Sequence, residues 1–316
     1  MKLNGADKQT PRRGTIAKSF RRYWDMYLLL ILPIIYFCIF KYRPMGALII
    51  AFKNFKIKQG YFGSPWAADH GFQHFIRFFK NAYFIQILKN TVSLSVLQLL
   101  FSFPVPIILA LVMNEIRKTR FKKTLQMVTY VPHFISTVVL VAIVDSLVAP
   151  RTGIINQLIM GMGGNSIYFA SKPEWFKPLY IISGIWQNAG YSSIIYLATL
   201  TNIDPQLIEA AKIDGANRIK IIGHIMIPGI LPTAITLLIM DFGKIMNIGF
   251  EKAYLMHNSM NAQTSEVIAT YIYKQGMEQL QYSYSTAVGL FNALINIVLL
   301  LAVNKIAKTV SDTSLW

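Results

Sequence analysis

The stretch EAAKIDGA at residues 209–216, followed by IMIP at residues 225–228, decides how the rest of the chain is interpreted. Its residues are charged or small and favour a helix, yet it lies between two apolar runs that are each long enough to cross a bilayer. A polar helix between two membrane spans must lie at the membrane surface, because charged side chains are costly in hydrocarbon. There it can contact a soluble partner while it stays joined to both spans.

Local signals in this insert predict a short helix, a tight turn and a second short helix. Asp204 before a proline is a favourable helix start, since its carboxylate can cap free amides and the proline loses no needed donor. Gly215 allows the left-handed backbone that ends such a helix, with Asn217 as the alternative. Helical spacing resumes at Arg218, and Pro228 is expected to break it where the next span begins. From these residues alone, a plain amphipathic linker and a docking element for another protein both remain open.

The composition is that of a membrane protein. Apolar residues make up 54% of the chain and charged residues only 14%, so a water-soluble core of ordinary proportions is not expected. The net charge of +17 comes from basic residues at the N-terminus and in connectors, which is typical of contact with anionic lipid rather than nucleic acid. The single cysteine, Cys38, lies in an apolar run, so no disulfide framework or thiolate metal site is predicted. The N-terminal region lacks the plan of a signal peptide, and the first apolar run is predicted to be an uncleaved span.

Six apolar runs predict an all-α integral membrane protein with six transmembrane helices. Helices are the expected form because backbone groups in lipid must be paired internally and the runs are too long for barrel strands. The predicted spans are approximately Trp24–Phe40, Thr91–Met113, Leu125–Val148, Leu179–Leu200, Ile230–Ile248 and Ala287–Val303.

Lysine and arginine in short connectors predict the orientation. The segment before the first span and the connector at residues 114–124 are both rich in these residues, which places both in the cytoplasm. Six spans then return the C-terminus and the 209–216 insert to the same side. The connector after the first span is also basic, but it is long, and long connectors follow the rule less well. The predicted organisation is a cytoplasmic basic segment 1–23, a first span 24–41, an external connector 42–90, a core 91–304 with five spans and the loop 201–228, and a cytoplasmic tail 305–316.

The spacing within the insert resembles the EAA loop of binding-protein-dependent ABC importer permeases. The pattern is EAA at residues 209–211, glycine at position 215, and Ile-x-Ile-Pro at residues 225–228. The family more often has leucine where Ile227 stands. Further segments are similar to the polysaccharide-uptake branch of carbohydrate permeases: KYRPMG at 41–46, GSPW at 63–66, FEKAYLM at 250–256 and QYSYS at 281–285. The PMGA run at 44–47 departs from the Pro-Met-Tyr-Gly that is more usual in that branch.

The resemblance implies the six-helix MetI-like fold of type I ABC importers and the work of a permease subunit. In that family the loop helix docks into a cytoplasmic ATPase, whose closing and opening rocks the spans between inward- and outward-facing states. The implied partners are two ATPase subunits that bind ATP and Mg, a second related permease, an extracytoplasmic solute-binding protein and an oligosaccharide, in a bacterial cell membrane. No cofactor is expected in this chain. The implied docking residues are Glu209, Ala210, Ala211, Asp214, Gly215, Arg218 and Pro228.

Motor and catalytic motifs are absent from the sequence. A phosphate-binding loop of the Gly-x4-Gly-Lys-Ser/Thr type does not occur, since Gly243-Lys244 is followed by isoleucine. The five histidines are scattered without a His-Glu-x-x-His motif, and His70 and His74 are expected to be a surface pair rather than metal ligands. A transporter subunit rather than an enzyme is therefore predicted. An ATPase-independent secondary transporter of small solutes is the alternative, although no internal repeat supports it.

Polar residues inside the apolar runs are candidates for a substrate pathway. Each buried charge there costs about 2.5–3.5 kcal/mol on insertion scales, so it normally faces a pathway or a partner. An internal ion pair between Asp241 and Lys244 is the simpler interpretation of those two, and the amides can equally join helices together. Trp186 and Tyr191 can stack on a sugar ring or serve packing alone. The predicted pathway residues are Gln98, Gln187, Asn188, Asp241, Lys244, Asn247, Asn292 and Asn296.

Overall fold

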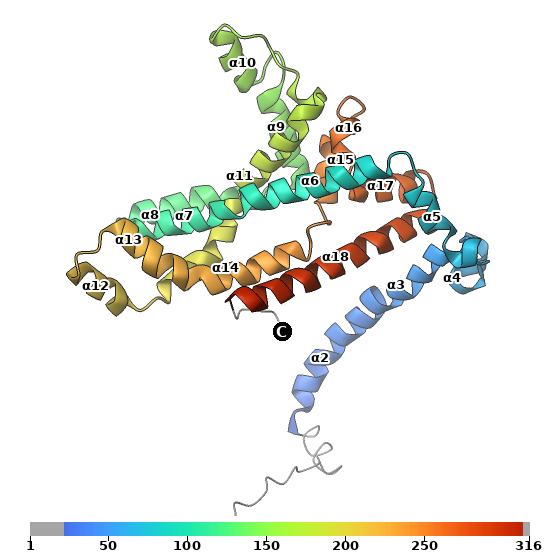
Figure 1. Ribbon diagram of the computed structural model, residues 1–316, viewed down its shortest axis with the longest axis horizontal. Coiled ribbons are helices and arrows are strands. Elements are labelled where there is room, and N and C mark those ends of the chain that lie inside the picture. Colours follow the sequence, from blue (N-terminus) through green and yellow to red (C-terminus); the bar gives the residue numbers. More distant parts are fainter. Residues whose placement is uncertain (1–21, 312–316) are drawn as a thin grey trace, which may run out of the picture.

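A computed structural model describes residues 22–311, and this part of the chain is almost entirely helical (Figure 1). Within that range the β structure is one isolated antiparallel bridge between Lys53 and Trp66. The all-α prediction is confirmed. Most of the basic N-terminal segment 1–23 and the end of the tail 305–316 lie outside the described residues.

Helical structure follows the chain in three groups. The first group is α2 (Trp24–Phe37), α3 (Arg43–Gly46), α4 (Gly60–Gly63), α5 (Gln73–Phe79), α6 (Phe84–Ser102) and α7 (Pro104–Glu115). The second is α8 (Thr119–Tyr130), α9 (Thr137–Val148), α10 (Ile154–Gly161), α11 (Pro173–Thr201), α12 (Pro205–Ile213) and α13 (Arg218–Ile221). The third is α14 (Ile227–Phe242), α15 (Phe250–Met256), α16 (Ala262–Ser265), α17 (Ile268–Tyr273) and α18 (Tyr282–Ser311).

Four helical segments among the described residues are long and apolar enough to cross a membrane, and a bent pair makes a fifth if it is one span. α11 contains the predicted fourth span and is 29 residues long, but it is not among these four. Four to five apolar helices therefore establish a multi-pass architecture, and the number six stays a prediction. The four segments are Trp24–Phe52, Phe84–Glu115, Arg218–Phe242 and Tyr282–Thr309, and the pair is Thr119–Phe134 with Thr137–Val148.

The third predicted span, Leu125–Val148, is a sharply bent pair of helices rather than one straight helix. α8 gives way to a short 3₁₀ turn at Val131–Phe134, and α9 then leaves at an angle of 105°. Pro132 cannot donate a backbone hydrogen bond, which favours a stop there. The Ser136 hydroxyl accepts a hydrogen bond from the Val139 amide at 3.4 Å and caps the new helix. A proline followed by a capping serine thus turns one predicted span into two helices.

The fifth predicted span, Ile230–Ile248, is displaced toward the N-terminus. The helix runs from Arg218 to Phe242, and the predicted break at Pro228 does not occur. A π-helical turn at Ile222–Met226 precedes the proline, with the Ile227 amide donating to the Ile222 carbonyl. Because this turn holds an extra residue, the helix passes through Pro228 at an early position of α14 without a break.

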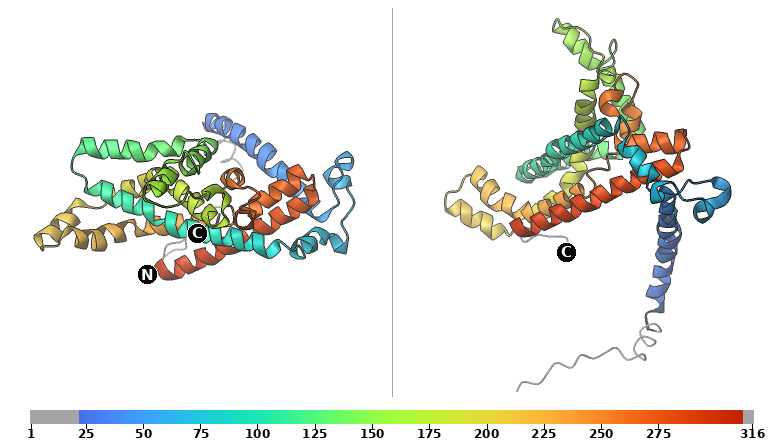
Figure 2. Two further views of the ribbon diagram at one scale, coloured as in Figure 1. Left: turned by 90° about the horizontal axis from the view of Figure 1, so that it is seen from above. Right: turned by 45° about the vertical axis from the view of Figure 1, so that its right-hand side comes forward.

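Long helices surround a shared interior (Figure 1). α6 and α7 continue one another, α14 and α18 lie side by side, and α11 packs chiefly against α7. α2 stands away from the other helices in Figure 1 and in the right-hand view of Figure 2, and none of its residues is buried in this chain. α12 and α13 form one end of the molecule, and the short α4 and α5 lie at the other. These two ends are joined by the long helices that line the interior.

Candidate functional site

The polar insert around residues 209–216 forms a helix–turn–helix unit at one end of the molecule. The Asp204 carboxylate accepts a hydrogen bond from the Gln206 amide at 2.9 Å, so the predicted cap of α12 is confirmed. Gly215 has φ +75°, which confirms the predicted left-handed end of that helix. Asn217 has a different role from the predicted one: its side chain accepts from the Lys220 amide at 2.9 Å and caps α13.

The turn at Gly215 is a Schellman motif. The Ala216 amide donates to the Ala211 carbonyl at 2.9 Å, and the Gly215 amide donates to the Lys212 carbonyl at 3.1 Å. These two bonds pair carbonyls that the end of α12 would otherwise leave free. The turn therefore fixes the angle between α12 and α13 through the backbone alone, and only its glycine is restricted in type.

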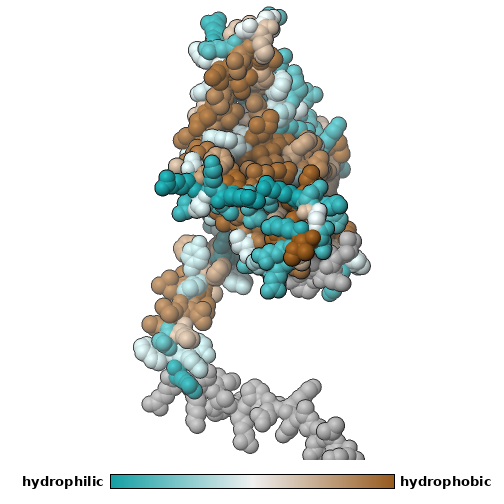
Figure 3. Space-filling model, turned by 90° about the vertical axis from the view of Figure 1, so that its left-hand side faces the viewer, coloured by the Kyte–Doolittle hydropathy of each residue, from teal (hydrophilic) through white to brown (hydrophobic). Residues whose placement is uncertain are grey.

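The outer side of this unit presents charged, small and apolar side chains together. Of the predicted docking residues, all except Ala211 are exposed, whereas Ala211 is half-buried against a core cluster that includes Ile221 and Met226. Ile213 is 86% exposed and Ile219 is 79% exposed, which is unusual for isoleucine in a folded chain. Figure 3 faces this end and shows a hydrophilic surface interrupted by a small apolar patch.

The inner side of the unit is fixed to the long helices. Buried Ile221 and Met226 pack in one cluster with Ala110 and Met113 of α7. The Arg218 guanidinium lies 3.9 Å from the carboxylate of Glu115 at the end of α7. The Arg218 side chain is exposed and that of Glu115 half-buried, so this long pair at the surface adds about 0–1 kcal/mol at most. Apolar packing, rather than the ion pair, therefore holds the unit against the long helices.

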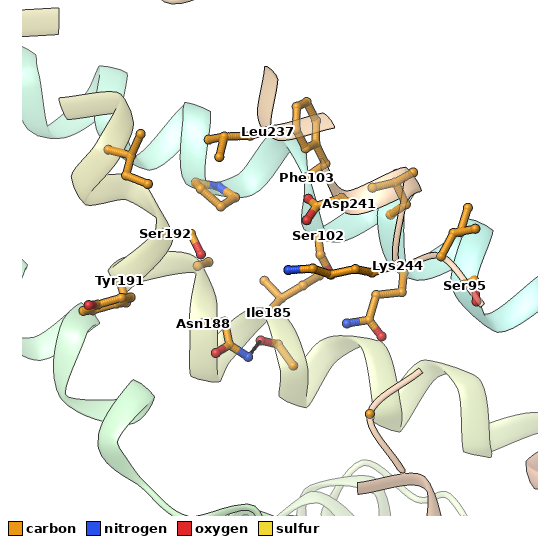
Figure 4. Close-up of a pocket in the computed structure, with 18 of the residues that line it drawn as sticks. Ser95, Ser102, Phe103, Ile185, Asn188, Tyr191, Ser192, Leu237, Asp241 and Lys244 are labelled. Atoms are coloured by element: carbon orange, nitrogen blue, oxygen red, sulfur yellow. Dashed lines mark hydrogen bonds between the residues drawn. The ribbon is translucent and has the colours of Figure 1, made fainter. Parts of the chain in front are cut away.

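A cavity of about 570 Å³ lies between α6, α7, α11, α14 and the segment 244–249 (Figure 4). Five of the eight predicted pathway residues line it: Gln98, Asn188, Asp241, Lys244 and Asn247. Hydroxyl groups of Ser95, Ser102 and Ser192 add to its polar lining. Amide, hydroxyl and charged groups in one cavity of this size are suited to a polar ligand with many hydroxyls.

Three of the predicted pathway residues do not line this cavity. Gln187 donates from its side-chain amide to the Ile135 carbonyl at 2.9 Å, which ties α11 to the bend before α9. The side-chain amides of Asn292 and Asn296 both donate to the Asn247 carbonyl oxygen, at 2.9 and 3.2 Å. The Asn296 oxygen in turn accepts from the Met246 amide at 3.0 Å. These residues join helices together, which is the alternative role for amides in membranes.

Asp241 and Lys244 share the cavity but do not pair. Among the ion pairs of residues 22–311, none joins the carboxylate of Asp241 to the ammonium group of Lys244. Their only direct bond is between backbone groups, the Lys244 amide and the Asp241 carbonyl, at 3.0 Å. In Figure 4 the Lys244 side chain extends into the open cavity. The predicted internal ion pair between their side chains is therefore absent from residues 22–311, although the two residues follow one another within a single turn after α14.

Lys252 was not among the predicted residues, yet it lies directly behind the cavity wall. Its side chain is 8% exposed, and its ammonium group donates to the Tyr180 carbonyl at 2.7 Å and lies 4.5 Å from the Tyr180 ring centre. Burial lowers the pKa of Lys252 to about 7, because the charged form loses hydration. The sequence held the residue within FEKAYLM at 250–256, but nothing there indicated that α15 would bring it to the cavity.

Of the two predicted aromatic residues, Tyr191 lines the cavity and also packs on a histidine. Tyr191 stacks on the His133 ring at 4.0 Å with an angle of 4°, and His133 also bonds the Asn188 side chain at 3.0 Å. This contact joins α11 to the bend between α8 and α9. Trp186 is 48% exposed and does not line the cavity.

The histidine pair of the connector 42–90 is not a surface pair. His74 is buried, and its Nε2 lies 3.2 Å from the Lys53 carbonyl oxygen, whereas His70 is exposed. Across the described residues, no group of three His, Cys, Asp or Glu side chains is arranged to hold a metal ion.

Comparison with known proteins gives the family. The model of the binding-protein-dependent transport system inner membrane component matches residues 102–312. The chain belongs to this family. As a member with four to five apolar helices, it is a multi-pass membrane protein. The matched region includes the helix–turn–helix unit of α12 and α13, the cavity-lining α11 and α14, and all of α18.

Two relatives from Bacillus subtilis strain 168 match nearly the whole chain. The polygalacturonan/rhamnogalacturonan transport system permease protein YteP is 42% identical over 98% of this chain and 95% of its own length. The protein LplB is 44% identical over 92% of this chain and 91% of its own.

A solved structure supports the same architecture. A bacterial ABC transporter involved in the import of the acidic polysaccharide alginate has a subunit 40% identical to this chain, with a TM-score of 0.87 over 94% of this chain and 99% of that one. A second structure shows the alginate transporter with a periplasmic protein bound to an alginate pentasaccharide, at a TM-score of 0.86.

Proposed function

We propose that this chain is a transmembrane permease subunit of an ATP-binding-cassette importer that takes up oligosaccharides. Its relatives include a permease for polygalacturonan and rhamnogalacturonan, and its structural neighbour imports alginate. The neighbour was also solved with a periplasmic protein that holds the sugar, which supports delivery by an extracytoplasmic solute-binding protein here. The 570 Å³ cavity between α6, α11 and α14, with its amide, hydroxyl and charged groups, is where a sugar would pass.

The exposed unit of α12, Gly215 and α13 is the observation on which this proposal depends most. It joins α11 to the long helix that begins at Arg218, and its inner side packs on α7. Glu209, Asp214 and Ile213 lie on its outer surface. A displacement of this unit by a bound partner is therefore transmitted to the helices that line the cavity. Since the chain has no phosphate-binding loop of its own, ATP and Mg would be bound by two separate ATPase subunits in the cytoplasm.

The proposed arrangement in the bacterial plasma membrane has six spans and both termini in the cytoplasm. α8 with α9 would supply the third span and α11 the fourth, in addition to the four long apolar segments. The loop 201–228 then lies on the cytoplasmic side. The outward apolar surface of α2, with no residue buried in this chain, is available to lipid or to a second related permease in a heterodimer.

Cross-linking from the loop tests the coupling. Cysteine is placed at Glu209, and at Met162 as a control, because both positions are exposed and Met162 follows α10 far from α12. In membranes that contain the assembled importer, the Glu209 cysteine is expected to form a cross-link with the ATPase subunit and the Met162 cysteine none. Alkylation by an impermeant reagent from outside the cell at the Glu209 cysteine would contradict the cytoplasmic position.

Transport in proteoliposomes separates the proposal from a secondary transporter. Uptake of a labelled galacturonate oligomer is expected only with the binding protein outside, the ATPase subunits present and ATP supplied to the ATPase side. Uptake that persists without the ATPase subunits, driven by an ion gradient, would overturn the proposal.

A further inference from the structure

The ammonium group of Lys252 is buried with few partners. Within residues 22–311 it is in no ion pair with a carboxylate, and its contacts are the Tyr180 carbonyl at 2.7 Å and the Tyr180 ring. An ammonium group has three N–H donors, so one carbonyl and one ring leave it incompletely compensated. Burial of such a charge is unfavourable unless a further acceptor or an anion reaches it.

Gly184 has no side chain, so nothing at this position separates the cavity from the Lys252 ammonium group. Gly184 lines the cavity, and a Cβ at that position would lie 3.1 Å from the Lys252 ammonium nitrogen and 3.7 Å from the Gln98 amide nitrogen. Two N–H donors from different helices, α15 and α6, thus point at the space that a side chain at Gly184 would fill. An acceptor group in the cavity can approach both of them there.

A second cation reaches the same cavity from the segment after α14. Lys244 projects into the open space (Figure 4), and no carboxylate in the described residues pairs with it. Asp241 is the one carboxylate among the cavity-lining residues, whereas Lys244 in the lining and Lys252 behind Gly184 supply two lysines. The Asp241 carboxylate is suited to accept from sugar hydroxyls, whereas the lysines and Gln98 are suited to donate to an anion.

We propose that Lys244, Lys252 and Gln98 form a subsite for the carboxylate of an acidic sugar, so that the cavity favours uronate oligosaccharides over neutral ones of equal length. This inference rests on the proposed function of oligosaccharide import and assigns the substrate class to the same cavity. A carboxylate has two oxygens, which allows one to accept from an ammonium group and the other from the Gln98 amide. Gly184 determines specificity, because its lack of a side chain keeps Lys252 within reach.

The test uses two probes that differ only in charge: tetragalacturonate and its fully methyl-esterified, neutral form. Binding of each is measured by calorimetry on the purified importer in detergent without the solute-binding protein, so that this protein's own selectivity does not enter. Lys244→Gln and Lys252→Met are each expected to weaken tetragalacturonate binding about tenfold or more, since each removes a charge-assisted hydrogen bond. Binding of the methyl ester is expected to stay within about twofold.

Two further variants separate recognition from folding. Lys89→Gln removes one exposed lysine from α6 outside the cavity lining and is expected to change neither affinity. Gly184→Ala places a methyl group 3.1 Å from the Lys252 nitrogen and is expected to act like Lys252→Met on the acidic probe alone. Lys252→Met is also expected to keep or raise the melting temperature of the complex, because it replaces a buried charge by an apolar chain of similar length.

Different outcomes would overturn the acidic subsite and the proposed function of oligosaccharide import. Two results would overturn the acidic subsite while leaving sugar import intact. One is an equal loss of affinity for both probes in Lys244→Gln and Lys252→Met. The other is equal affinity of the native importer for the two probes. Failure of the native importer to take up any oligosaccharide in proteoliposomes with its ATPase and binding protein would overturn the proposed function and the subsite with it.

Discussion

The surface unit of α12 and α13 and the cavity between α6, α11 and α14 were predictable to very different degrees. The unit is built from contacts between residues a few positions apart, such as Asp204 with Gln206 and Gly215 with Lys212. The cavity is built from residues far apart in sequence, as when the Lys252 ammonium group reaches the Tyr180 carbonyl. Local backbone chemistry can therefore be inferred from a single sequence, whereas the lining of an interior depends on how helices end and bend.

The largest effect is expected at the turn of the surface unit. Gly215→Pro replaces a residue at φ +75° by one whose ring fixes φ near −65°, so the Schellman turn cannot form. Uptake is expected to fall at least about tenfold while basal ATP hydrolysis by the complex continues, because the link rather than the motor is broken. Uptake and ATP hydrolysis are measured on the same proteoliposomes.

The matched control for this turn is Gly215→Asn. Asparagine tolerates the left-handed region, and a Cβ at this position meets no atom within 4 Å. Most of the uptake should therefore be retained. Normal transport in Gly215→Pro would show that the geometry of the surface unit does not matter for coupling. The surface unit and the cavity would then no longer differ in function as proposed.

An intermediate effect is expected where the cavity is joined to α18. Asn247→Leu removes the oxygen that accepts from both Asn292 and Asn296, so two amides lose a partner in the interior. The loss is expected to destabilise the protein by about 1–3 kcal/mol, the cost of leaving a buried polar group unsatisfied. Thermal unfolding of the complex in detergent measures it.

Asn188→Leu serves as the comparison for Asn247→Leu, since Asn188 also lines the cavity but bonds His133 and its own helix. It should destabilise the protein less. Equal melting temperatures for the two variants would indicate that Asn247 has no special structural part, and the amide pair on α18 would again be candidates for direct sugar contact.

The smallest effect is expected at the ion pair between the surface unit and α7. Arg218→Gln removes the contact with Glu115 at 3.9 Å, which is exposed and worth about 0–1 kcal/mol. Uptake is expected to stay within about twofold of the native protein. A double-mutant cycle with Glu115→Gln measures the pair directly, and a coupling energy well above that range would mean that the charge pair, rather than the apolar cluster, holds the unit on the spans.

Sequence reasoning succeeded where one residue type has one backbone consequence. Gly215 and Asp204 were assigned correctly because a left-handed turn and a helix cap each favour few residues. It failed at Pro228, where a break was predicted: Pro132 lies where α8 ends, whereas Pro228 is absorbed by the π turn before it. The ring constraint is the same in both, so the outcome is decided by neighbouring backbone that the sequence does not reveal.

The lining of the cavity was also only partly predictable, because it depends on how side chains pack. Of the predicted pathway residues, Gln98 and Asn188 line the cavity, whereas Asn292 and Asn296 bind Asn247 instead. A polar residue in an apolar run indicates that it avoids lipid, and two environments satisfy that condition equally. Lys252 was missed because it lies in a short helix between the last two long ones, where charge is ordinary in sequence terms.

The π turn at Ile222–Met226 also sets the rotational phase of everything after it. One residue more than an α-helical turn rotates each later side chain by about 100° around the helix axis. Deletion of a single residue from this turn would therefore swing Leu237 and Asp241 away from the sugar-sized opening and toward a different neighbour. The distance along the helix would change by only about 1.5 Å. A single inserted residue near the surface thus governs which groups face the interior some twenty ångströms away.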